Sequence, residues 1–294
     1  MDKRKLSFLL AFTASLIYGV SFTIAKDVMP LHIKPYAFIL FRVAGATVLF
    51  WILSISIAKE PIEKKDFQRI FSAAFFGIAL NMLTFFKGLS LTTPINGAVI
   101  MVTSPIIVLI FSSLFLKEPI TKKKAFGVTI GMIGAILIIL YGPTAVLNAP
   151  NIKWGNFLVF VNAVSFSFYI ILAKPMLKKY HPFTFIKWMY LIGTFMVLPF
   201  GISEVLEMNL STIPTIAFYK IGFIVVFTTF ITYLFNLIAL RSLKPTTLSV
   251  FLYLQPLIAS IYAINVGSDN LTYTKVIAAG LIFGGVYLVS SKKG

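Results

Sequence analysis

The chain is a succession of long apolar stretches separated by short polar connections. Ten of these stretches reach the length of about 20 residues at which an α-helix crosses roughly 30 Å of hydrocarbon. They cover Leu6–Ala25, Tyr36–Ala58, Gln68–Gly88, Pro94–Leu116, Lys123–Tyr141, Trp154–Lys174, Phe183–Ser203, Ala217–Leu240, Thr246–Val266 and Thr272–Ser291. The pattern predicts an all-α integral membrane protein with ten transmembrane helices.

The two halves of the chain repeat one pattern. At a shift of 151 residues the following pairs coincide: Pro94 and Pro245, Pro105 and Pro256, Glu118 and Asp269, Gly134 and Gly285. Each half contains five spans, and because five is odd the second half enters the membrane from the opposite side. We therefore expect two inverted five-helix repeats, over residues 1–145 and 146–294. Inverted repeats around a midplane site are typical of secondary transporters.

Composition and charge agree with a membrane protein. Apolar residues make up 59% of the 294 residues and charged residues 12%, and the mean hydropathy is +0.94, whereas a soluble domain carries about 25% charged residues. The net charge of +17 follows the connections: with a cytoplasmic N-terminus, 18 basic residues fall in cytoplasmic segments and 6 in outer segments. This positive-inside pattern predicts a multi-pass protein of the cell (inner) membrane with both termini in the cytoplasm. The partner of the basic residues is then the lipid bilayer and not nucleic acid.

Motifs of other protein classes do not occur in the sequence. There is no cysteine, which excludes disulfides, thiolate metal sites and a cysteine nucleophile. We find no HExxH, no Gly-x-Ser-x-Gly and no phosphate-binding Gly-x-x-x-x-Gly-Lys loop. We therefore expect no enzymatic activity, no cofactor and no metal. The expected partner is a small-molecule substrate, and the chain is expected to act as a monomer or homodimer.

Pro105 and Pro256 lie at the middle of the fourth and ninth spans, at equivalent positions of the two halves. Proline removes a helical hydrogen bond, and in lipid the freed carbonyl must find a partner or line a cavity. The freed carbonyls would be those of Met101 and Leu252. Paired discontinuities indicate a midplane binding site, although two kinks that only shape helix packing would give the same pattern.

Polar side chains within the spans recur at helical intervals. Ser104 and Gln255 directly precede the two prolines, and a glutamine at this depth is costly unless it faces protein or water. The other candidate binding residues on these polar faces are Tyr18, Phe22, Asn81, Thr84, Asn162, Tyr169, Thr232, Tyr233, Asn236 and Tyr253. A hydroxyl that bonds its own helix, or an Asn that joins two helices, would explain any one of them. Their convergence from both halves predicts one partly polar cavity whose aromatic rings could stack on a planar or amphipathic solute.

Ionisable residues bear on the mechanism. All nine acidic residues are placed in termini or connections. Cation-coupled carriers commonly use an intramembrane carboxylate, so facilitated diffusion or exchange is favoured. The deepest charge is Arg42, about two helical turns inside the second span, where its side chain could equally extend to the outer surface. With Lys26 and Lys87 it would form an electropositive entrance, and we therefore expect a substrate with a carboxylate or other anionic group.

One stretch resembles a known transporter repeat. NGAVIMVTSPIIVLIFSSLFLKEPI, followed by three spaced glycines, resembles the second part of an EamA repeat. The residues that match the rest of the repeat are Tyr18, Gly19, Lys26, Arg42, Gly127, Gly131 and Gly134. The chain is thus similar over nearly its whole length to ten-helix EamA-type members of the drug/metabolite transporter superfamily. The second half is more diverged, with Asp269 in place of the usual Glu and Met189 near the place of the Arg.

The resemblance implies a cavity lined by the first, third, fourth, sixth, eighth and ninth spans. It leaves the substrate open, because the family carries amino acids, other metabolites, drugs and nucleotide derivatives. Two glycine pairs, Gly127/Gly131 and Gly280/Gly284, have the small-xxx-small spacing that packs helices together.

The sequence as a whole predicts a secondary transporter that works by alternating access. Its substrate is expected to be a small polar or zwitterionic, amino-acid-like metabolite, exported across the cytoplasmic membrane by facilitated diffusion or exchange. Two alternatives stay open: proton-coupled efflux of drugs or cationic amphiphiles, and translocation of a lipid precursor.

Overall fold

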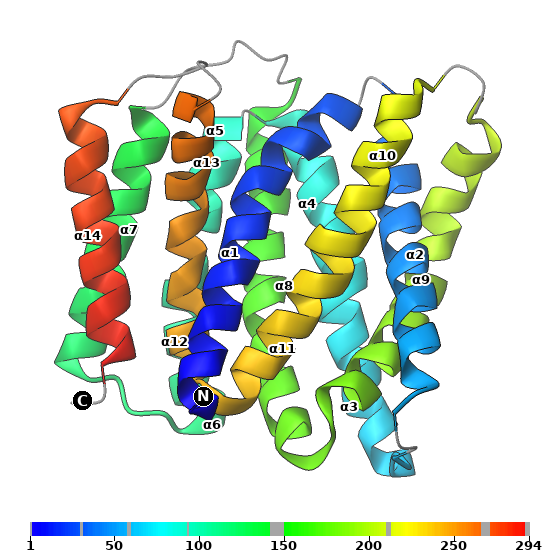
Figure 1. The fold of residues 1–294 in the computed structure, drawn as a ribbon, viewed down its shortest axis with the longest axis horizontal. Coiled ribbons are helices and arrows are strands. Elements are labelled where there is room, and N and C mark those ends of the chain that lie inside the picture. The colour runs from blue at the N-terminus through cyan, green and yellow to red at the C-terminus, as the bar shows by residue number, and fades with distance from the viewer. Residues whose placement is uncertain are drawn as a thin grey trace.

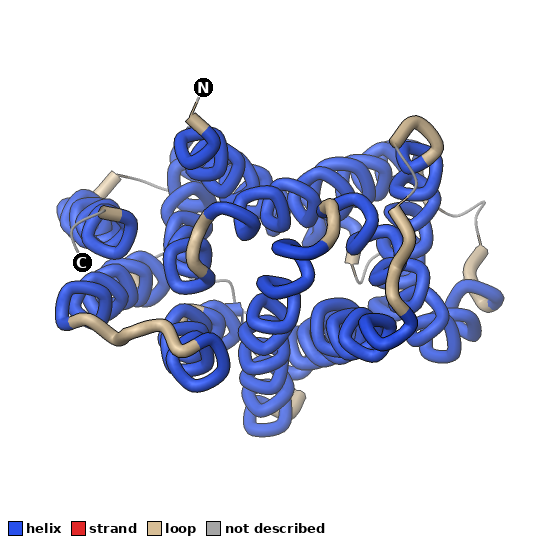
Figure 2. Tube along the Cα trace, turned by 90° about the horizontal axis from the view of Figure 1, so that it is seen from below, coloured by secondary structure: helices blue, strands red, loops and turns tan. Residues whose placement is uncertain are grey.

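The computed structural model describes residues 2–29, 32–57, 60–92, 94–141, 150–209, 213–265 and 271–291. At residues 22, 23, 25–27, 94–96 and 263 it describes the backbone without the side chain. Over these residues no strand occurs, and the helices lie side by side as one bundle (Figure 1). Viewed from below, most of the helices are seen nearly end-on (Figure 2).

Within the described residues, ten helical segments match the ten predicted spans. Those of the first half are α1 (Lys3–Val28), α2 (Pro35–Ser54), α3–η1–α4 (Lys64–Ala74, Phe75–Ala79, Leu80–Leu91), α5–α6 (Pro94–Met101, Ser104–Leu116) and α7 (Lys122–Leu140). Those of the second half are α8 (Ile152–Lys179), α9 (Pro182–Leu206), α10–η3–α11 (Thr215–Phe223, Ile224–Ile231, Thr232–Ser242), α12–η4–α13 (Pro245–Ser249, Val250–Tyr253, Leu254–Asn265) and α14 (Tyr273–Ser290).

Most of these segments are suited to a bilayer. Eight of those described are long and apolar enough to cross a membrane by length and hydropathy alone. The remaining two, α1 and α12–η4–α13, stand beside them in the same bundle (Figure 1). The protein is therefore an all-α integral membrane protein, as predicted.

Corresponding segments of the two halves run in opposite directions. α1 begins at the end of the molecule that carries both termini, whereas its counterpart α8 ends there (Figure 1). The contacts are exchanged in the same way, because α8 packs on α4 and α6 while α1 packs on α11 and α13. Equivalent hydroxyls of α2 and α9 meet, with Thr47 Oγ1 2.8 Å from Thr194 Oγ1. The fold thus consists of two inverted five-helix repeats, and the predicted boundary between residues 145 and 146 lies outside the described residues.

Two helix pairs form the opposite ends of the bundle, α7 with α14 and α2 with α9 (Figure 1). Small residues let the backbones of α7 and α14 approach closely. A Cβ added at Gly134 would lie 2.7 Å from the carbonyl oxygen of Ala278, and one added at Gly285 would lie 2.6 Å from that of Gly127. The prediction that Gly127 packs helices is confirmed.

The prediction that Gly280 and Gly284 pack helices is wrong. Gly280 is exposed, with no heavy atom within 4 Å of an added Cβ, and Gly284 reaches only Ile130 at 3.8 Å. The buried face of α14 follows another line of residues, namely Ala278, Ile282, Gly285 and Val289. The i, i+4 spacing of two glycines does not say which side of a helix faces its neighbour.

The third span of each half contains a π-helical stretch, η1 in the first half and η3 in the second. A π-helical turn holds an extra residue and weakens the regular hydrogen-bond ladder. Side chains bind the carbonyls there: Ser165 Oγ of α8 donates to Phe76 O at 2.6 Å, and Thr229 Oγ1 donates to Ile224 O at 2.9 Å. These stretches were not part of the predicted pattern, which assumes a uniform α-helical period.

The regular α-helical winding of the fourth span is interrupted in each half. α5 ends at Met101, and Pro105 lies in the first turn of α6, where the missing N–H is not needed. In the second half the 3₁₀ stretch η4 precedes α13. We predicted a free carbonyl at Leu252, but the carbonyl bound by another helix is that of Phe251, which accepts from Ser15 Oγ at 3.0 Å. The tighter 3₁₀ winding shifts the residue that faces α1.

The prediction that every acidic residue lies in a terminus or connection is wrong for three of them. Asp27 lies in the last turn of α1, where the structure describes its backbone without the side chain. Asp66 lies in the first turn of α3 and Glu204 near the C-terminal end of α9, because both helices extend beyond the apolar stretch. Glu204 Oε2 accepts the backbone N–H groups of Tyr36 and Ala37 at 2.8 and 2.9 Å. Asp66 Oδ2 accepts from Lys179 Nζ at 2.6 Å. Both carboxylates therefore stabilise helix ends and lie away from the middle of the bundle.

Candidate substrate-binding cavity

A cavity of about 500 Å³, counted to where it meets solvent, lies between α1, α8, α11 and the α12–η4–α13 segment. It occupies the half of the molecule that carries both termini, because α12 and the C-terminal part of α11 form part of its wall (Figure 1). Its lining residues are Ser15, Tyr18, Phe166, Tyr169, Ile170, Tyr233, Asn236, Leu237, Leu240, Leu248, Ser249, Phe251, Leu252 and Gln255. Hydroxyl and amide groups share the surface with apolar side chains, and none of these lining residues is charged.

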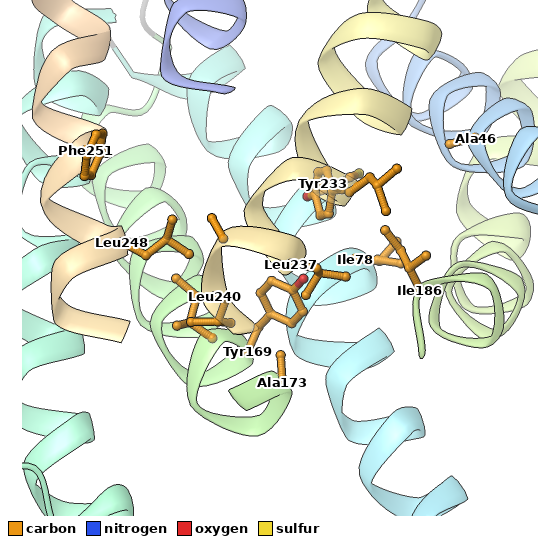
Figure 3. Close-up of a cluster of buried hydrophobic side chains, with 14 of the residues drawn as sticks. Ala46, Ile78, Tyr169, Ala173, Ile186, Tyr233, Leu237, Leu240, Leu248 and Phe251 are labelled. Atoms are coloured by element: carbon orange, nitrogen blue, oxygen red, sulfur yellow. The ribbon is translucent and has the colours of Figure 1, made fainter. Parts of the chain in front are cut away.

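Two walls of the cavity can be seen in Figure 3. Leu248 and Phe251 come from α12 and η4 on one side. Tyr169 of α8 and Leu240 of α11 come from the other side. The cavity therefore separates segments that belong to the second repeat, and α1 of the first repeat supplies Ser15.

The π-helical stretch η1 supports two of the cavity's tyrosines. A Cβ added at Gly77 would lie 2.5 Å from the ring of Tyr169, so only a glycine lets that ring lie against the backbone. The Tyr233 hydroxyl donates to the Gly77 carbonyl at 3.4 Å. The position of both rings thus depends on the local geometry of η1.

Five of the predicted binding residues line the cavity: Tyr18, Tyr169, Tyr233, Asn236 and Gln255. They come from α1, α8, α11 and α13, which are distant in the sequence. The structure therefore brings aromatic and amide side chains from both repeats to one place.

The predicted residues Asn81, Asn162 and Thr84 lie outside the cavity. Their contacts join two helices or lie within one helix. Asn162 is buried, and its Nδ2 donates to the backbone carbonyl of Asn81 at 2.7 Å, which ties α8 to α4. The Thr84 hydroxyl donates to Leu80 O of its own helix at 2.6 Å. These contacts match the alternative stated from the sequence, that an Asn joins neighbouring helices and a Thr bonds its own.

The residues at the helix breaks do not line the cavity apart from Gln255. Ser104 is fully buried, its Oγ has no hydrogen-bond partner among the described residues, and its carbonyl accepts from Ser167 Oγ at 3.3 Å. Pro105 is buried in α6, and Pro256 is partly exposed in α13. The predicted residue Phe22 has a side chain outside the described part of the chain.

Tyr253 does not share the face of its polar neighbours. Its ring packs against α7, where a Cβ added at Gly131 would lie 2.6 Å from it. The side chain is fully buried and its hydroxyl has no partner among the described residues. Tyr253 ends the 3₁₀ stretch η4, whose three residues per turn rotate it away from the line that an α-helix would follow.

Arg42 is buried in the half of the bundle opposite the termini. Its side chain is 7% exposed, and its Nε donates to Thr229 Oγ1 at 3.1 Å. The guanidinium carbon lies 5.8 Å from the ring centre of Phe38 and 5.3 Å from that of Phe86, which are cation–π distances. None of the ion pairs found among the described residues involves Arg42. The prediction that it could extend to the outer surface is therefore wrong.

A column of hydroxyl groups connects Arg42 with the cavity along η3 and α11. Thr228 Oγ1 lies 2.6 Å from Ser21 Oγ of α1, and Thr229 accepts from Arg42. One turn further on, the buried Thr232 interacts with the Tyr18 hydroxyl, which also reaches Asn236. The predicted residues Arg42 and Thr232 thus lie outside the cavity but continue its polar wall.

The apolar part of the wall was not predicted as part of the site. It consists of Phe166, Ile170, Leu237, Leu240, Leu248, Phe251 and Leu252. In a membrane sequence such residues are indistinguishable from those that face lipid or pack helices. The signal that could have found Leu237 and Leu240 is their position four residues after Tyr233 and Asn236, respectively, on one helical face.

Lys174 joins α8 to the C-terminal end of α11 below the cavity. Its Nζ donates to the carbonyls of Leu240 and Leu243 at 2.6 and 2.7 Å. A cation is favourable there because the last carbonyls of a helix are unpaired and carry partial negative charge. Leu240 lines the cavity, so this contact closes the α8–α11 side of its wall.

Three polar groups of the cavity have apolar counterparts in the other repeat. At the shift of 151 residues, Tyr233, Asn236 and Ser249 correspond to Met82, Phe85 and Ala98. At the same shift Tyr169 corresponds to Tyr18 and Gln255 to Ser104, so the two repeats share a backbone plan and part of the chemistry of their inner faces.

Over the part of the chain that the structure describes, no group of three His, Cys, Asp or Glu side chains could hold a metal ion.

The chain matches the model of the EamA-like transporter family twice, over residues 5–140 and 153–291. The chain belongs to the EamA-like transporter family. The resemblance drawn from its motifs is therefore confirmed, and the protein is a membrane transporter of the drug/metabolite transporter superfamily.

Relatives are found in bacteria and archaea. The chain is 26% identical over 279 residues to the uncharacterized transporter YyaM of Bacillus subtilis (strain 168), which covers 94% of this chain and 90% of the relative. It is 29% identical over 286 residues to an uncharacterized transporter of Archaeoglobus fulgidus, which covers 97% and 98% of the two chains. A crystal structure of a protein with 14% identity superposes with a TM-score of 0.79 over 96% of this chain and 95% of that chain, and this likeness shows the shared fold.

Proposed function

We propose that this transporter exports a small amphipathic solute with an anionic or zwitterionic head, such as an amino acid, by alternating access. The cavity supports this solute class because its tyrosines and amides can bind a charged head while its Leu, Ile and Phe side chains contact an apolar tail.

The observation that carries the proposal is the buried charge of Arg42, which lacks an ion-pair partner among the residues that the structure describes. A cation removed from water is costly unless a counter-charge is supplied, and none of the ion pairs among the described residues supplies one. The hydroxyl column leads from the cavity to this guanidinium. An anionic group of the solute, moving along the column, is the counter-charge that we infer.

The proposed transport is not coupled to a cation. Proton- and sodium-coupled carriers commonly hold the ion with a carboxylate at membrane depth. Asp66 and Glu204, the acidic residues within helices whose side chains the structure describes, cap helix ends and are already paired. Asp27 lies in the last turn of α1, at the end of its helix. Facilitated diffusion or exchange is therefore proposed in place of proton-coupled drug efflux.

The proposed location is the cell (inner) membrane, with both termini in the cytoplasm. The excess of basic residues in the connections on that side supports this orientation. The cavity lies in the same half as the termini (Figure 1), so the solute would enter it from the cytoplasm.

The test is counterflow in proteoliposomes. A panel of amino acids, beginning with L-phenylalanine, is screened for thermal stabilisation of the purified protein, and radiolabelled uptake is measured into vesicles preloaded with the same compound. We expect saturable uptake that preloading accelerates. Uptake that never saturates, or that an imposed pH gradient accelerates at fixed solute protonation, would contradict the proposal.

Replacing Arg42 provides the residue-specific test. Arg42→Ala should abolish counterflow, and Arg42→Lys should retain part of it, because a lysine keeps the charge without the fork of donors. Lys187→Ala is the matched control, since Lys187 is also a cation within a helix but lies 5.1 Å from the Trp51 ring, away from the cavity lining. Unchanged counterflow in Arg42→Ala, or an equal loss in Lys187→Ala, would refute the role of Arg42.

A further inference from the structure

We propose that Tyr190 is a positioning residue for solute binding and acts through Tyr233. When an anionic solute is bound, the Tyr233 hydroxyl turns from the Gly77 carbonyl to the solute and donates to it. The Tyr190 hydroxyl then donates to the Tyr233 oxygen. This inference rests on the proposed function and adds a residue that does not touch the solute.

Tyr190 of α9 carries a hydroxyl that completes no hydrogen bond within the described part of the chain. The side chain is fully buried, its ring packs 5.0 Å from that of Phe50, and its hydroxyl has no hydrogen-bond partner among the described residues. A buried donor without an acceptor is unfavourable compared with a phenylalanine in the same place. A buried tyrosine hydroxyl without an acceptor is explained if another step of the transport cycle supplies the acceptor.

The nearest candidate for that acceptor is Tyr233. The two rings meet edge to face with their centres 5.4 Å apart, and the Tyr190 hydroxyl lies near that of Tyr233 without completing a hydrogen bond to it. Tyr190 does not line the cavity, whereas Tyr233 does. Tyr233 therefore stands between the solute space and the Tyr190 hydroxyl.

The present partner of Tyr233 is weakly held. Its hydroxyl donates to Gly77 O at 3.4 Å, well beyond the distance of about 2.7–2.8 Å that is usual for O–H···O bonds. A carboxylate would be a stronger acceptor than this carbonyl. Exchange of Gly77 for a solute carboxylate is thus favourable. The Tyr233 oxygen keeps a lone pair in either state, and a small shift of its ring toward the solute lets it accept from Tyr190.

The chemistry is a two-step hydrogen-bond chain in which no proton is transferred. Tyr190 O–H donates to Tyr233, and Tyr233 O–H donates to the anionic group. Each bond in such a chain polarises the next, so the donor behind strengthens the bond to the solute. Binding also supplies an acceptor to a donor that had none.

The chain contains a matched control at Tyr253. Like Tyr190, Tyr253 is fully buried and its hydroxyl has no partner among the described residues. Unlike Tyr190, it packs against Gly131 of α7, away from Tyr233 and the cavity. Tyr190→Phe and Tyr253→Phe thus remove the same atom from equally buried places.

The experiment measures counterflow of L-phenylalanine, or of the amino acid in the panel that the wild-type protein carries fastest. Tyr190→Phe should raise the half-saturation concentration about fivefold and leave the maximal rate within about twofold, as expected for the loss of one hydrogen bond in the bound state. Tyr253→Phe should change neither. In a Tyr233→Phe background, Tyr190→Phe should have no further effect, because its acceptor is gone. The unfolding temperature of the solute-free protein should rise or stay the same in both single variants.

Three results would overturn the inference. They are a half-saturation concentration in Tyr190→Phe equal to that of the wild type, an equal increase in Tyr253→Phe, and an undiminished effect in the Tyr233→Phe background. Wild-type vesicles that carry no amino acid of the panel would instead contradict the proposed function, and the inference would fail with it. The wild-type rate therefore distinguishes the two failures.

Discussion

At the scale of single residues, the backbone of Lys117 is unusual. Among the described residues other than glycine, it alone has a left-handed conformation, with φ of 55°. It ends α6, and the backbone N–H of Glu118 turns back to the carbonyl of Ser112 at 3.1 Å. This geometry is common at helix C-termini, where glycine is the preferred residue because it has no Cβ.

Lys117→Gly should therefore stabilise the protein. The left-handed conformation costs a residue with a Cβ roughly 1 kcal/mol, part of which glycine loses again to backbone entropy. Thermal unfolding in detergent should show a small increase in the midpoint temperature. Lys122→Gly, at the start of α7, serves as the comparison and should lower it. A lower midpoint for Lys117→Gly would show that the lysine side chain matters more than the strain.

At the level of single residues, the sequence indicates which polar side chains avoid lipid. Tyr18, Asn236 and Gln255 are polar groups at places where lipid would be costly, and the cavity contains all three. Asn162 satisfies the same criterion but binds the carbonyl of Asn81. Polarity predicts that a residue avoids lipid, and it does not predict which partner the residue finds. The hydroxyl of Tyr190 could not be singled out, since an unused donor becomes visible only when its surroundings are known.

At the scale of helices, the ends of the bundle depend on close contact between backbones. The α7–α14 pair is held where Gly134 meets Ala278 and Gly285 meets Gly127. Lipid offers apolar side chains the same surroundings as a neighbouring helix, so close packing rather than hydrophobicity holds such a pair together. The smallness of these residues is therefore a requirement of the fold.

Gly285→Val should weaken the α7–α14 pair strongly, whereas Gly280→Val should be nearly neutral. An added Cβ at Gly285 would lie 2.6 Å from a backbone carbonyl, while Gly280 has open space around it. Overpacking of this kind costs about 1–3 kcal/mol. Thermal unfolding of the purified variants, or their yield from membranes, measures the difference. Equal behaviour of the two variants would show that α14 does not depend on this contact.

The sequence predicted the helices far better than their interruptions. An apolar stretch of about 20 residues is a sufficient signal for a span, and the described segments agree with the ten predicted. The π-helical η1 and η3 and the 3₁₀ η4 each change the number of residues per turn. Their presence depends on partners such as Ser165 and Ser15, which approach from other helices. A periodicity measured within one helix contains no information about those partners, and this is why Tyr253 was placed on the wrong face.

At the scale of the whole molecule, both termini lie at one end of the bundle (Figure 1). Lys5 lies in the first turn of α1, at the end of the bundle that carries the termini. Leu271 directly precedes α14, which begins at the other end and runs toward the C-terminus. Both residues are exposed, so they mark opposite ends of the bundle. The chain contains no cysteine. A single introduced cysteine is therefore the only thiol in the protein.

Accessibility of two such cysteines should report the proposed orientation. In intact cells, a membrane-impermeant maleimide should label Leu271→Cys and should not label Lys5→Cys. After permeabilisation both should react, which controls for buried or unfolded thiols. Labelling of Lys5→Cys in intact cells would reverse the orientation inferred from the basic residues.

The unequal inner faces of the two repeats have a consequence for kinetics. Where the second repeat has Tyr233, Asn236 and Ser249, the first has Met82, Phe85 and Ala98. A passive carrier that offers more hydroxyls and amides to one compartment than to the other would capture its solute at a lower concentration on the first side and release it more readily on the second. Thermodynamics still requires the ratio of maximal rate to half-saturation concentration to be equal in the two directions. The half-saturation concentrations on the two sides would then differ, while the solute gradient alone would decide the direction of net flow.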